Sequence, residues 1–383
     1  MWGSGPITAV LTTDAAGVPL ASHVVASEGT QHVFYTSQGD GHVHEYWWRP
    51  GQVGATHGDL TSASGAPTGA GPLTSHVVDD DAGDQHRSTQ HVFYQSSDGH
   101  VRELWWSAAQ APSVGDLTAE SGAPPARNVT DPIRSGALAS HVFAAEGTQH
   151  VYFASQDGDV HELWWRGSQA AQHENLSMRA RRRAETPAAT GALTSHLDAG
   201  GVQHVLFVAG GAVIDLAWGQ GEDPLRRTLT AEATGAPAAS SPLTSHAMGD
   251  GTQHVFYVSA DRHVHELWWS RTQAARHEDI TVESKGPRAR SFITKMASHV
   301  LPADGSQHLY YPDEFVDIVH TSWIGDGGKR AERVLSPIHA LDASSASICG
   351  HVFRSDDTQH VLYWGSPRFT DNEFVLTEAW SKN

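Results

Sequence analysis

Four glutamates each stand two residues before a tryptophan, and this spacing is the clearest candidate for chemistry in the chain. Successive β-strand residues point to opposite faces, so residues two apart share a face and each carboxylate would lie beside an indole ring. A carboxylate accepts hydrogen bonds from hydroxyl groups, and an aromatic ring packs against apolar C–H groups. Both properties suit a pyranose sugar. The pairs are Glu45 with Trp47, Glu103 with Trp105, Glu162 with Trp164, and Glu266 with Trp268.

Three further segments hold the same place in the chain but lack the full pair. Their residues are Asp215 with Ala217, His320 with Ser322, and Thr377 with Ala379. Acid and tryptophan weaken in the same segments, which indicates a shared role. A structural reading stays open, in which the carboxylate accepts backbone or histidine hydrogen bonds and the tryptophan only adds packing.

The pairs recur because the chain repeats a unit of about 53 residues seven times. A period of 40 to 55 residues with several short strands per unit is typical of propeller blades or stacked arrays. Each unit begins with a Ser-His or Gly-His marker, continues with a Gln-His marker and ends with a tryptophan. The first markers begin at Ser22, Ser75, Ser140, Ser195, Ser245, Ser298 and Gly350. The closing tryptophans are Trp48, Trp106, Trp165, Trp218, Trp269, Trp323 and Trp380, and we expect them to pack between blades.

Each unit is expected to form four strands, which the second unit illustrates. They are Leu73–Val78, Gln90–Tyr94, His100–Trp106 and the short Asp116–Thr118. Aromatic and β-branched residues on both sides of an Asp-Gly turn predict a β-hairpin between the second and third strands. Since no stretch has a long 3.6-residue period, helix should be rare.

A Leu-Thr-like pair follows the tryptophan in six units, and the seventh lacks one. The pairs are Leu60-Thr61, Leu117-Thr118, Leu176-Ser177, Leu229-Thr230, Ile280-Thr281 and Leu335-Ser336. A similar pair, Leu11-Thr12, precedes the first unit, so the N-terminal strand is expected to complete the last blade. Closure of this kind leaves no open sheet edge. The sequence therefore predicts an all-β fold, a closed seven-bladed β-propeller with four-stranded blades, as a single domain over residues 1–383.

The repeat resembles that of seven-bladed bacterial propeller lectins of the PLL type, and more distantly that of fungal fucose-specific propeller lectins. Gly251–Trp269 carries the pattern Gly-Thr-Gln-His-Val-Phe-Tyr followed by His-Val-His-Glu-Leu-Trp-Trp, with Arg262 in place of the turn glycine. The resemblance extends from about Leu11 to Trp380. It implies binding of fucose-like or O-methylated glycans at several inter-blade sites, without catalysis and without a metal.

Histidine is abundant, with 26 residues, and 14 of them belong to the two markers of each unit. A neutral imidazole has one donor and one acceptor, which suits a repeated hydrogen bond between strands or blades. The pairs His42/His44 and His263/His265 each share a strand face and could bind Zn²⁺ or Cu²⁺ loosely. They have no carboxylate or cysteine partner at metal-site spacing, so we expect neither metal nor cofactor.

Composition limits partners and location. A net charge of −18 argues against general nucleic-acid binding. The single cysteine, Cys349, excludes an internal disulfide framework. No apolar run approaches the ~18 residues needed to span a bilayer, and the first residues lack the basic and apolar regions of a signal peptide. These features favour a protein without membrane insertion, either cytoplasmic or released without a classical signal, and leave a homo-oligomer possible.

Two other function classes stay open. An enzyme could use the axial funnel or the two most divergent units, where Asp313, Glu314, Asp317 and His320 cluster. It would require a deep pocket with paired, perturbed titratable groups. A protein-interaction scaffold would instead present a flat aromatic patch without a sugar-sized pocket.

Overall fold

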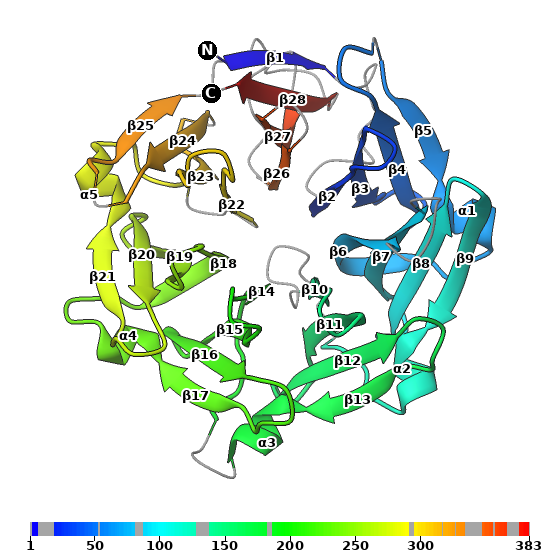
Figure 1. The fold of residues 1–383 in the computed structure, drawn as a ribbon, viewed down its shortest axis with the longest axis horizontal. Coiled ribbons are helices and arrows are strands. Elements are labelled where there is room, and N and C mark those ends of the chain that lie inside the picture. The colour runs from blue at the N-terminus through cyan, green and yellow to red at the C-terminus, as the bar shows by residue number, and fades with distance from the viewer. Residues whose placement is uncertain are drawn as a thin grey trace.

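Seven four-stranded antiparallel sheets are arranged in a ring, so the predicted seven-bladed all-β propeller is confirmed (Figure 1). The computed structural model describes residues 2–6, 19–52, 54–80, 87–127, 138–181, 186–290, 295–315, 317–325, 327–333, 347–354, 357–365 and 375–382. In each sheet the strands follow one another from the centre of the ring to its rim. No helix of the described residues is long and apolar enough to cross a membrane.

The first three blades use strands that are consecutive in the chain. Blade one comprises β2 (Leu20–Val25), β3 (Thr30–Thr36), β4 (Val43–Trp48) and β5 (Thr56–Asp59). Blade two comprises β6 (Gly69–Asp80), β7 (Arg87–Ser96), β8 (Val101–Ser107) and β9 (Gln110–Asp116). Blade three comprises β10 (Ala139–Phe143), β11 (Thr148–Ala154), β12 (Val160–Arg166) and β13 (Gln172–Asn175).

The remaining blades follow the same pattern, except that the last one draws a strand from the chain's beginning. Blade four comprises β14 (Leu193–Leu197), β15 (Gln203–Ala209), β16 (Ala212–Trp218) and β17 (Leu225–Thr228). Blade five comprises β18 (Ala239–Ala247), β19 (Gln253–Ser259), β20 (Val264–Trp269) and β21 (Arg276–Asp279). Blade six comprises β22 (Ala297–Val300), β23 (Gln307–Pro312), β24 (Ile318–Trp323) and β25 (Arg330–Arg333). Blade seven comprises β26 (Ile348–Phe353), β27 (Thr358–Gly365), β28 (Val375–Lys382) and β1 (Trp2–Pro6).

The N-terminal strand completes the last blade, as predicted. β1 pairs antiparallel with β28, from Trp2 opposite Ser381 to Pro6 opposite Thr377, and the two chain ends lie close together (Figure 1). The pair Leu11-Thr12, which suggested this closure, lies outside the described residues. The residues that close the ring are therefore earlier in the chain than expected.

The Leu-Thr pairs were wrongly expected to be strand four. In five blades they begin short helices at the rim (Figure 1): α1 (Leu60–Ser64), α2 (Leu117–Ser121), α3 (Leu176–Arg181), α4 (Leu229–Glu232) and α5 (Ile280–Ser284). The pair Leu335-Ser336 lies outside the described residues.

Helix capping explains this error. In blade two the strand ends at Asp116, whose carboxylate accepts the N–H of Ala119 and caps the helix. Thr118 turns inward, and its hydroxyl accepts the N–H of Val101 at 2.9 Å. The helix thus ties the outer edge of the blade to the start of strand three.

In five blades the closing tryptophan packs against the preceding blade. Trp106 of blade two meets Phe34 of blade one edge-on at 5.8 Å between ring centroids, and Trp165 meets Phe93 in the same way at 5.7 Å. Both tryptophans are buried. The predicted packing role is confirmed for these two residues and for Trp218, Trp269 and Trp323, which make equivalent ring contacts.

The first-marker histidines link neighbouring blades near the axis. Nε2 of His23 lies 3.0 Å from Gln90 Oε1 of the next blade, and His351 of blade seven reaches Gln31 of blade one at 2.7 Å. The same contact joins His76 to Gln149, His141 to Gln203, His246 to Gln307 and His299 to Gln359. The expected inter-blade hydrogen bond is therefore confirmed at these six interfaces.

Candidate functional site

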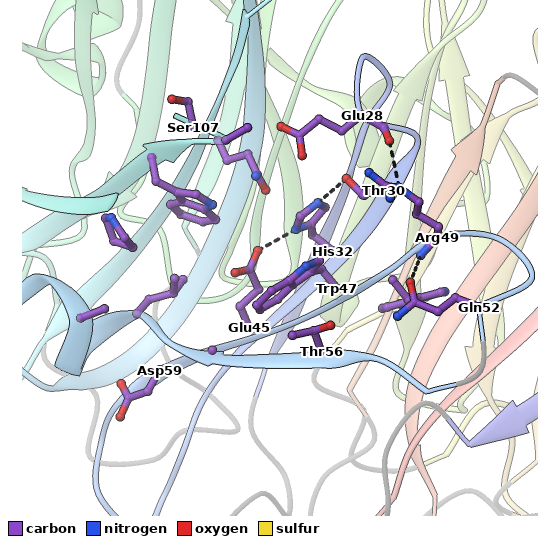
Figure 2. Close-up of a pocket in the computed structure, with 18 residues that line it drawn as sticks. Glu28, Thr30, His32, Glu45, Trp47, Arg49, Gln52, Thr56, Asp59 and Ser107 are labelled. Atoms are coloured by element: carbon purple, nitrogen blue, oxygen red, sulfur yellow. Dashed lines mark hydrogen bonds and ion pairs between the residues drawn. The ribbon is translucent and has the colours of Figure 1, made fainter. Parts of the chain in front are cut away.

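A cavity of about 520 Å³ lies between blades one and two, and it brings the first predicted pair together. Glu45, Trp47 and His32 line it from blade one (Figure 2). Trp106 and neighbouring residues line it from blade two. This volume falls within the range of small-ligand sites, roughly 300–1,000 Å³. The cavity thus combines a carboxylate and an indole ring in a space that can hold a monosaccharide.

A chain of hydrogen bonds holds the carboxylate of Glu45 in place. His32 Nδ1 lies 2.6 Å from Glu45 Oε1, and His32 Nε2 lies 2.7 Å from the hydroxyl of Thr30. Both contacts are drawn as dashed lines in Figure 2. Burial raises the pKa of Glu45 to about 8 and lowers that of His32 to about 4. The buried pair therefore resists carrying net charge, and its geometry is fixed before any ligand arrives.

The second carboxylate oxygen of Glu45 faces a gap left by a glycine. Gly58 on β5 is the register partner of Glu45. A Cβ at Gly58 would lie 3.2 Å from Trp47 Cζ3 and 3.8 Å from Glu45 Oε2. The missing side chain therefore leaves the ring and the oxygen next to a shared space.

The other predicted pairs have the same local structure. Glu103, Glu162 and Glu266 are buried, whereas Trp105, Trp164 and Trp268 are partly exposed. Each glutamate contacts the Gln-His histidine of its blade at 2.7 Å: His91 to Glu103, His150 to Glu162, and His254 to Glu266. Period-2 alternation therefore places acid and ring on one face as expected, and the structural hydrogen bond of the alternative reading is also present. Oε1 makes that bond in each blade.

Blade seven has a fifth Glu-Trp pair, which the comparison of the seven repeat units missed. β28 pairs with β27 so that Glu378 lies opposite Leu362 and Trp380 opposite His360. These are the positions of Glu45 and Trp47, which lie opposite Phe34 and His32. His360 Nδ1 contacts Glu378 Oε1 at 2.6 Å, and Trp380 is 38% exposed.

The expected packing role of Trp380 is therefore wrong. Ser381 instead holds the packing position, opposite Gln359, and its hydroxyl accepts the amide N–H of Gln359 at 2.8 Å. Thr377 and Ala379, which the sequence placed at the acid and ring positions of this blade, each lie one residue before the true positions, Glu378 and Trp380. The Glu-x-Trp spacing of residues 378 to 380 indicates this pair. It was missed because the last tryptophan of every repeat unit was treated as equivalent.

Blades four and six lack the pair, as predicted. In blade four Asp215 contacts His204 at 3.1 Å, and Ala217 replaces the ring. The equivalent cavity, about 600 Å³, contains Arg227, which lies opposite Asp215. In blade six His320 replaces the acid and bridges His308, at 2.8 Å, to Glu332, at 2.9 Å.

The residue on strand four opposite the acid divides the five pairs into two kinds. It is glycine in three blades: Gly58 opposite Glu45, Gly115 opposite Glu103, and Gly5 opposite Glu378. It is glutamate in two blades: Glu174 opposite Glu162, and Glu278 opposite Glu266. The three glycine blades (seven, one and two) are neighbours in the ring. Nothing in the spacing of acid and tryptophan indicated this division.

In blade five a lysine from the next blade reaches the predicted pair. Lys329 Nζ lies 3.5 Å from Glu266 Oε2 and also binds Glu278. The same ammonium group sits 4.9 Å from the ring centroid of Trp323, and its side chain is only 9% exposed. The oxygen of Glu266 that corresponds to the open one in blade one therefore already has a cationic partner.

Two of the acidic residues of blade six that suggested an enzyme make structural contacts. Asp313 is fully buried, and its Oδ1 accepts the N–H groups of Phe315 and Asp317. Glu314 pairs with Arg262 of blade five at 3.1 Å. These two acids therefore order the loop between strands and join neighbouring blades.

Solved bacterial and fungal proteins, including lectins, share this fold. The BP39L lectin from Burkholderia pseudomallei aligns with a TM-score of 0.66 and 13% identity over 96% of this chain and 96% of its own. AofleA from Arthrobotrys oligospora aligns with a TM-score of 0.52 and 13% identity, over 90% of this chain and 94% of its own. The fucose-specific lectin from Aleuria aurantia aligns with a TM-score of 0.53 and 13% identity, over 84% and 96%.

These similarities confirm the predicted relation to propeller lectins at the level of the fold. The Aleuria lectin is described as six-bladed, whereas this chain forms seven sheets. No protein-family model matches the chain, and no curated protein sequence matches it. Identity this low carries the architecture but not the ligand.

Proposed function

We propose that this protein is a multivalent lectin that binds sugars in pockets between its blades, without catalysis. The observation that carries the proposal is the pocket between blades one and two, where Glu45 Oε2 and the ring of Trp47 border one open space beside Gly58. The ring offers an apolar surface to the C–H face of a pyranose, and the carboxyl oxygen meets its hydroxyls.

The proposed ligands are fucose-like or O-methylated glycans. L-fucose and its methyl ethers have an extended C–H surface at the methyl groups, which suits packing on an exposed tryptophan. The names of the fold neighbours support this choice, because one is a fucose-specific lectin. A single pocket is expected to bind weakly, at roughly millimolar to micromolar Kd. Several pockets on one rigid ring raise avidity for a surface that displays many copies of the sugar.

Three pockets are proposed to be active: those of blades seven, one and two, where glycine lies opposite the acid. The pairs Glu162/Trp164 and Glu266/Trp268 remain candidates, but Glu174 and Glu278 add a second carboxylate there. Lys329 also bridges the two acids of blade five. The sequence predicted four sites, in blades one, two, three and five. We instead propose three, in blades seven, one and two.

A glycan array followed by calorimetric titration with L-fucose and O-methylated fucose tests the proposal. We expect about three sugars bound per chain. A value near five would mean that the Glu-Trp pair suffices whatever residue lies opposite. Failure of every glycan to bind the folded protein would overturn the lectin assignment.

Two variants of blade one sharpen the test. Trp47→Ala removes the stacking ring, and Gly58→Glu introduces the residue that blade three carries at Glu174; each should lower the stoichiometry by one. Gly58→Glu should leave the blade folded, because the backbone there is extended and only the indole of Trp47 must shift. Ala217→Ser in blade four, which lacks the pair, is the matched control and should change nothing.

A further inference from the structure

A second cluster of polar side chains lies on the other face of β4, and one of its members, Asp59, also borders the sugar pocket. His42 and His44 alternate with Glu45 along the chain, so they point to the face opposite that of Glu45 and Trp47. Asp40 in the preceding loop and Asp59 at the end of β5 converge on His42. One ligand atom from each of Asp40, His42 and Asp59 lies within 4.8 Å of the others.

The distances are close to those of a metal site. His42 Nδ1 lies 2.8 Å from Asp59 Oδ2 and 3.9 Å from Asp40 Oδ2. Bonds of 2.0–2.1 Å to a tetrahedral Zn²⁺ place neighbouring ligand atoms about 3.3 Å apart. The Asp40 side chain is 49% exposed, so it can move by the roughly 1 Å that closure around an ion requires.

His44 lies next to this group of three and contacts one of its members. His44 Nε2 lies 3.5 Å from Asp40 Oδ1, and His44 Nδ1 lies 3.1 Å from His57 Nε2. With the proton on Nδ1 donated to His57, Nε2 of His44 presents a lone pair toward the cluster. Such a hydrogen bond orients the imidazole ring and sets its tautomer.

Blade two shows that this position accepts a cation. The equivalent carboxylates, Asp98 and Asp116, both bind the guanidinium of Arg102, at 2.7 and 2.6 Å. His100 contacts Asp116 at 2.9 Å, as His42 contacts Asp59. Arg102 occupies the sequence position of His44, two residues after the loop histidine. Blade one thus keeps the two acids and replaces the built-in cation with an imidazole.

Blade five carries the same residue types in a different arrangement. Its loop is one residue shorter, and Ser259 binds Asp261 while lying 2.8 Å from His265 Nε2. The serine therefore stands between the acid and the second histidine. Among the described residues, Asp40, His42 and Asp59 form the group that meets the spacing for a metal.

We propose that blade one binds a divalent transition-metal ion, with Zn²⁺ the best match, through Asp40, His42 and Asp59, with His44 beside the site. The sequence expectation that this histidine pair lacks a carboxylate partner is wrong, because the loop and strand four supply two. Asp59 also caps α1, its Oδ1 accepting the N–H of Ser62. The ion would therefore tie the loop, β4 and α1 together and stabilise blade one.

Calorimetric titration of the tag-free protein with ZnCl₂, paired with Co²⁺ absorption spectra, tests this site. We expect one tight Zn²⁺ per chain, a Co²⁺ d–d band, and a higher Tm with Zn²⁺. Asp40→Asn should weaken binding at least about tenfold. His44→Arg should abolish binding without loss of folding, because the guanidinium would fill the site as Arg102 does in blade two.

Asp261→Asn in blade five is the matched control and should leave Zn²⁺ binding unchanged. The proposal is overturned if the folded wild type shows no tight site, if Asp40→Asn and His44→Arg both retain it, or if Asp261→Asn removes it. Sugar titration of the same variants keeps the two proposals separate, since Asp40 and His44 do not line the sugar pocket.

Discussion

Adjacent tryptophans at the end of strand three have different roles because neighbouring strand residues point to opposite faces. Trp106 is buried against Phe34 of the preceding blade. Trp105 is partly exposed and packs across Gly115, whose Cβ would lie 3.1 Å from its Cζ3. One ring therefore holds two blades together, and the other remains available to a ligand.

This difference predicts unequal effects of two alanine substitutions. Trp106→Ala should lower the free energy of unfolding by about 3–5 kcal/mol, because it leaves a cavity between blades one and two. Trp105→Ala should cost less than about 1.5 kcal/mol and remove one sugar site. Chemical denaturation and sugar titration of both variants provide the measurements. Equal losses of stability would contradict the assignment of the two faces.

At the scale of the element, strand four decides what each acid faces. Glycine at Gly58 and Gly115 leaves space beside the carboxylate. Glutamate at Glu278 instead draws Lys329 from the neighbouring blade into contact with Glu266. The same strand-three pair therefore gives an open pocket in one blade and a neutralised one in another.

Removing the side chains of Lys329 and Glu278 should create a sugar site in blade five. The double variant Lys329→Ala/Glu278→Gly gives blade five the arrangement of blade one, and the sugar stoichiometry should rise by one. The single variant Lys329→Ala leaves two neighbouring carboxylates without their cation and should be destabilised by about 3 kcal/mol. Calorimetry and thermal unfolding distinguish the two. If the double variant is stable but binds no additional sugar, the residue on strand four does not decide whether a pocket is open.

At the scale of the whole molecule, contacts between distant parts of the chain close the ring. β1 pairs with β28 at the rim, and His351 hydrogen-bonds to Gln31 near the axis. Both join blade seven to residues near the beginning of the chain. Closure therefore protects a strand edge that would otherwise pair with other molecules.

Deletion of residues 2–6 tests this closure. The edge of β28 would lose its partner, so we expect a lower Tm and concentration-dependent association. Thermal unfolding and light scattering measure the two effects, and Ser4→Thr, which keeps the strand, serves as the control. A truncated protein that stays monomeric with an unchanged Tm would show that β1 contributes little.

The ring of first-marker histidines makes the fold sensitive to acid. Burial lowers the pKa of His23, His141 and His246 to about 3 and that of His299 to about 4. Burial also lowers the pKa of the remaining three, His76, His196 and His351. The unfolded chain, with pKa values near 6.5, binds more protons than the folded one between pH 6.5 and these values. Stability is therefore full above pH 6.5 and is lost as the pH falls below it.

Each buried histidine should reduce the free energy of unfolding by about 1.4 kcal/mol per pH unit below pH 6.5. Glu45 contributes one proton of the opposite sign, since its raised pKa favours the folded state at lower pH. Denaturation between pH 7.5 and 4.5 should show a steep loss, and His246→Gln should reduce the slope by about one proton. Constant stability between pH 6.5 and 5 would contradict neutral histidines at the axis.

The sequence by itself determined the features that depend on local periodicity. Seven units, strands two and three, the Glu-Trp face and the packing role of tryptophans such as Trp106 follow from alternation and repeated markers. The wrong predictions from the sequence also concerned local features. Leu117 and Thr118 were expected to be strand, whereas they begin a helix that Asp116 caps. In β28 the strand register is shifted by one residue, which places Trp380 at the exposed ring position.

Only the tertiary structure decided which residues meet across strands and blades. Gly58 opposite Glu45, Lys329 beside Glu266, and Asp40 with Asp59 around His42 bring together residues separated in the chain. Their meeting depends on strand register, loop length and the approach of the next blade. A repeat reveals that such partners occupy equivalent places, but the partners' identities change from blade to blade. Those identities decide whether a pocket stays open, is filled by a lysine, or can hold an ion.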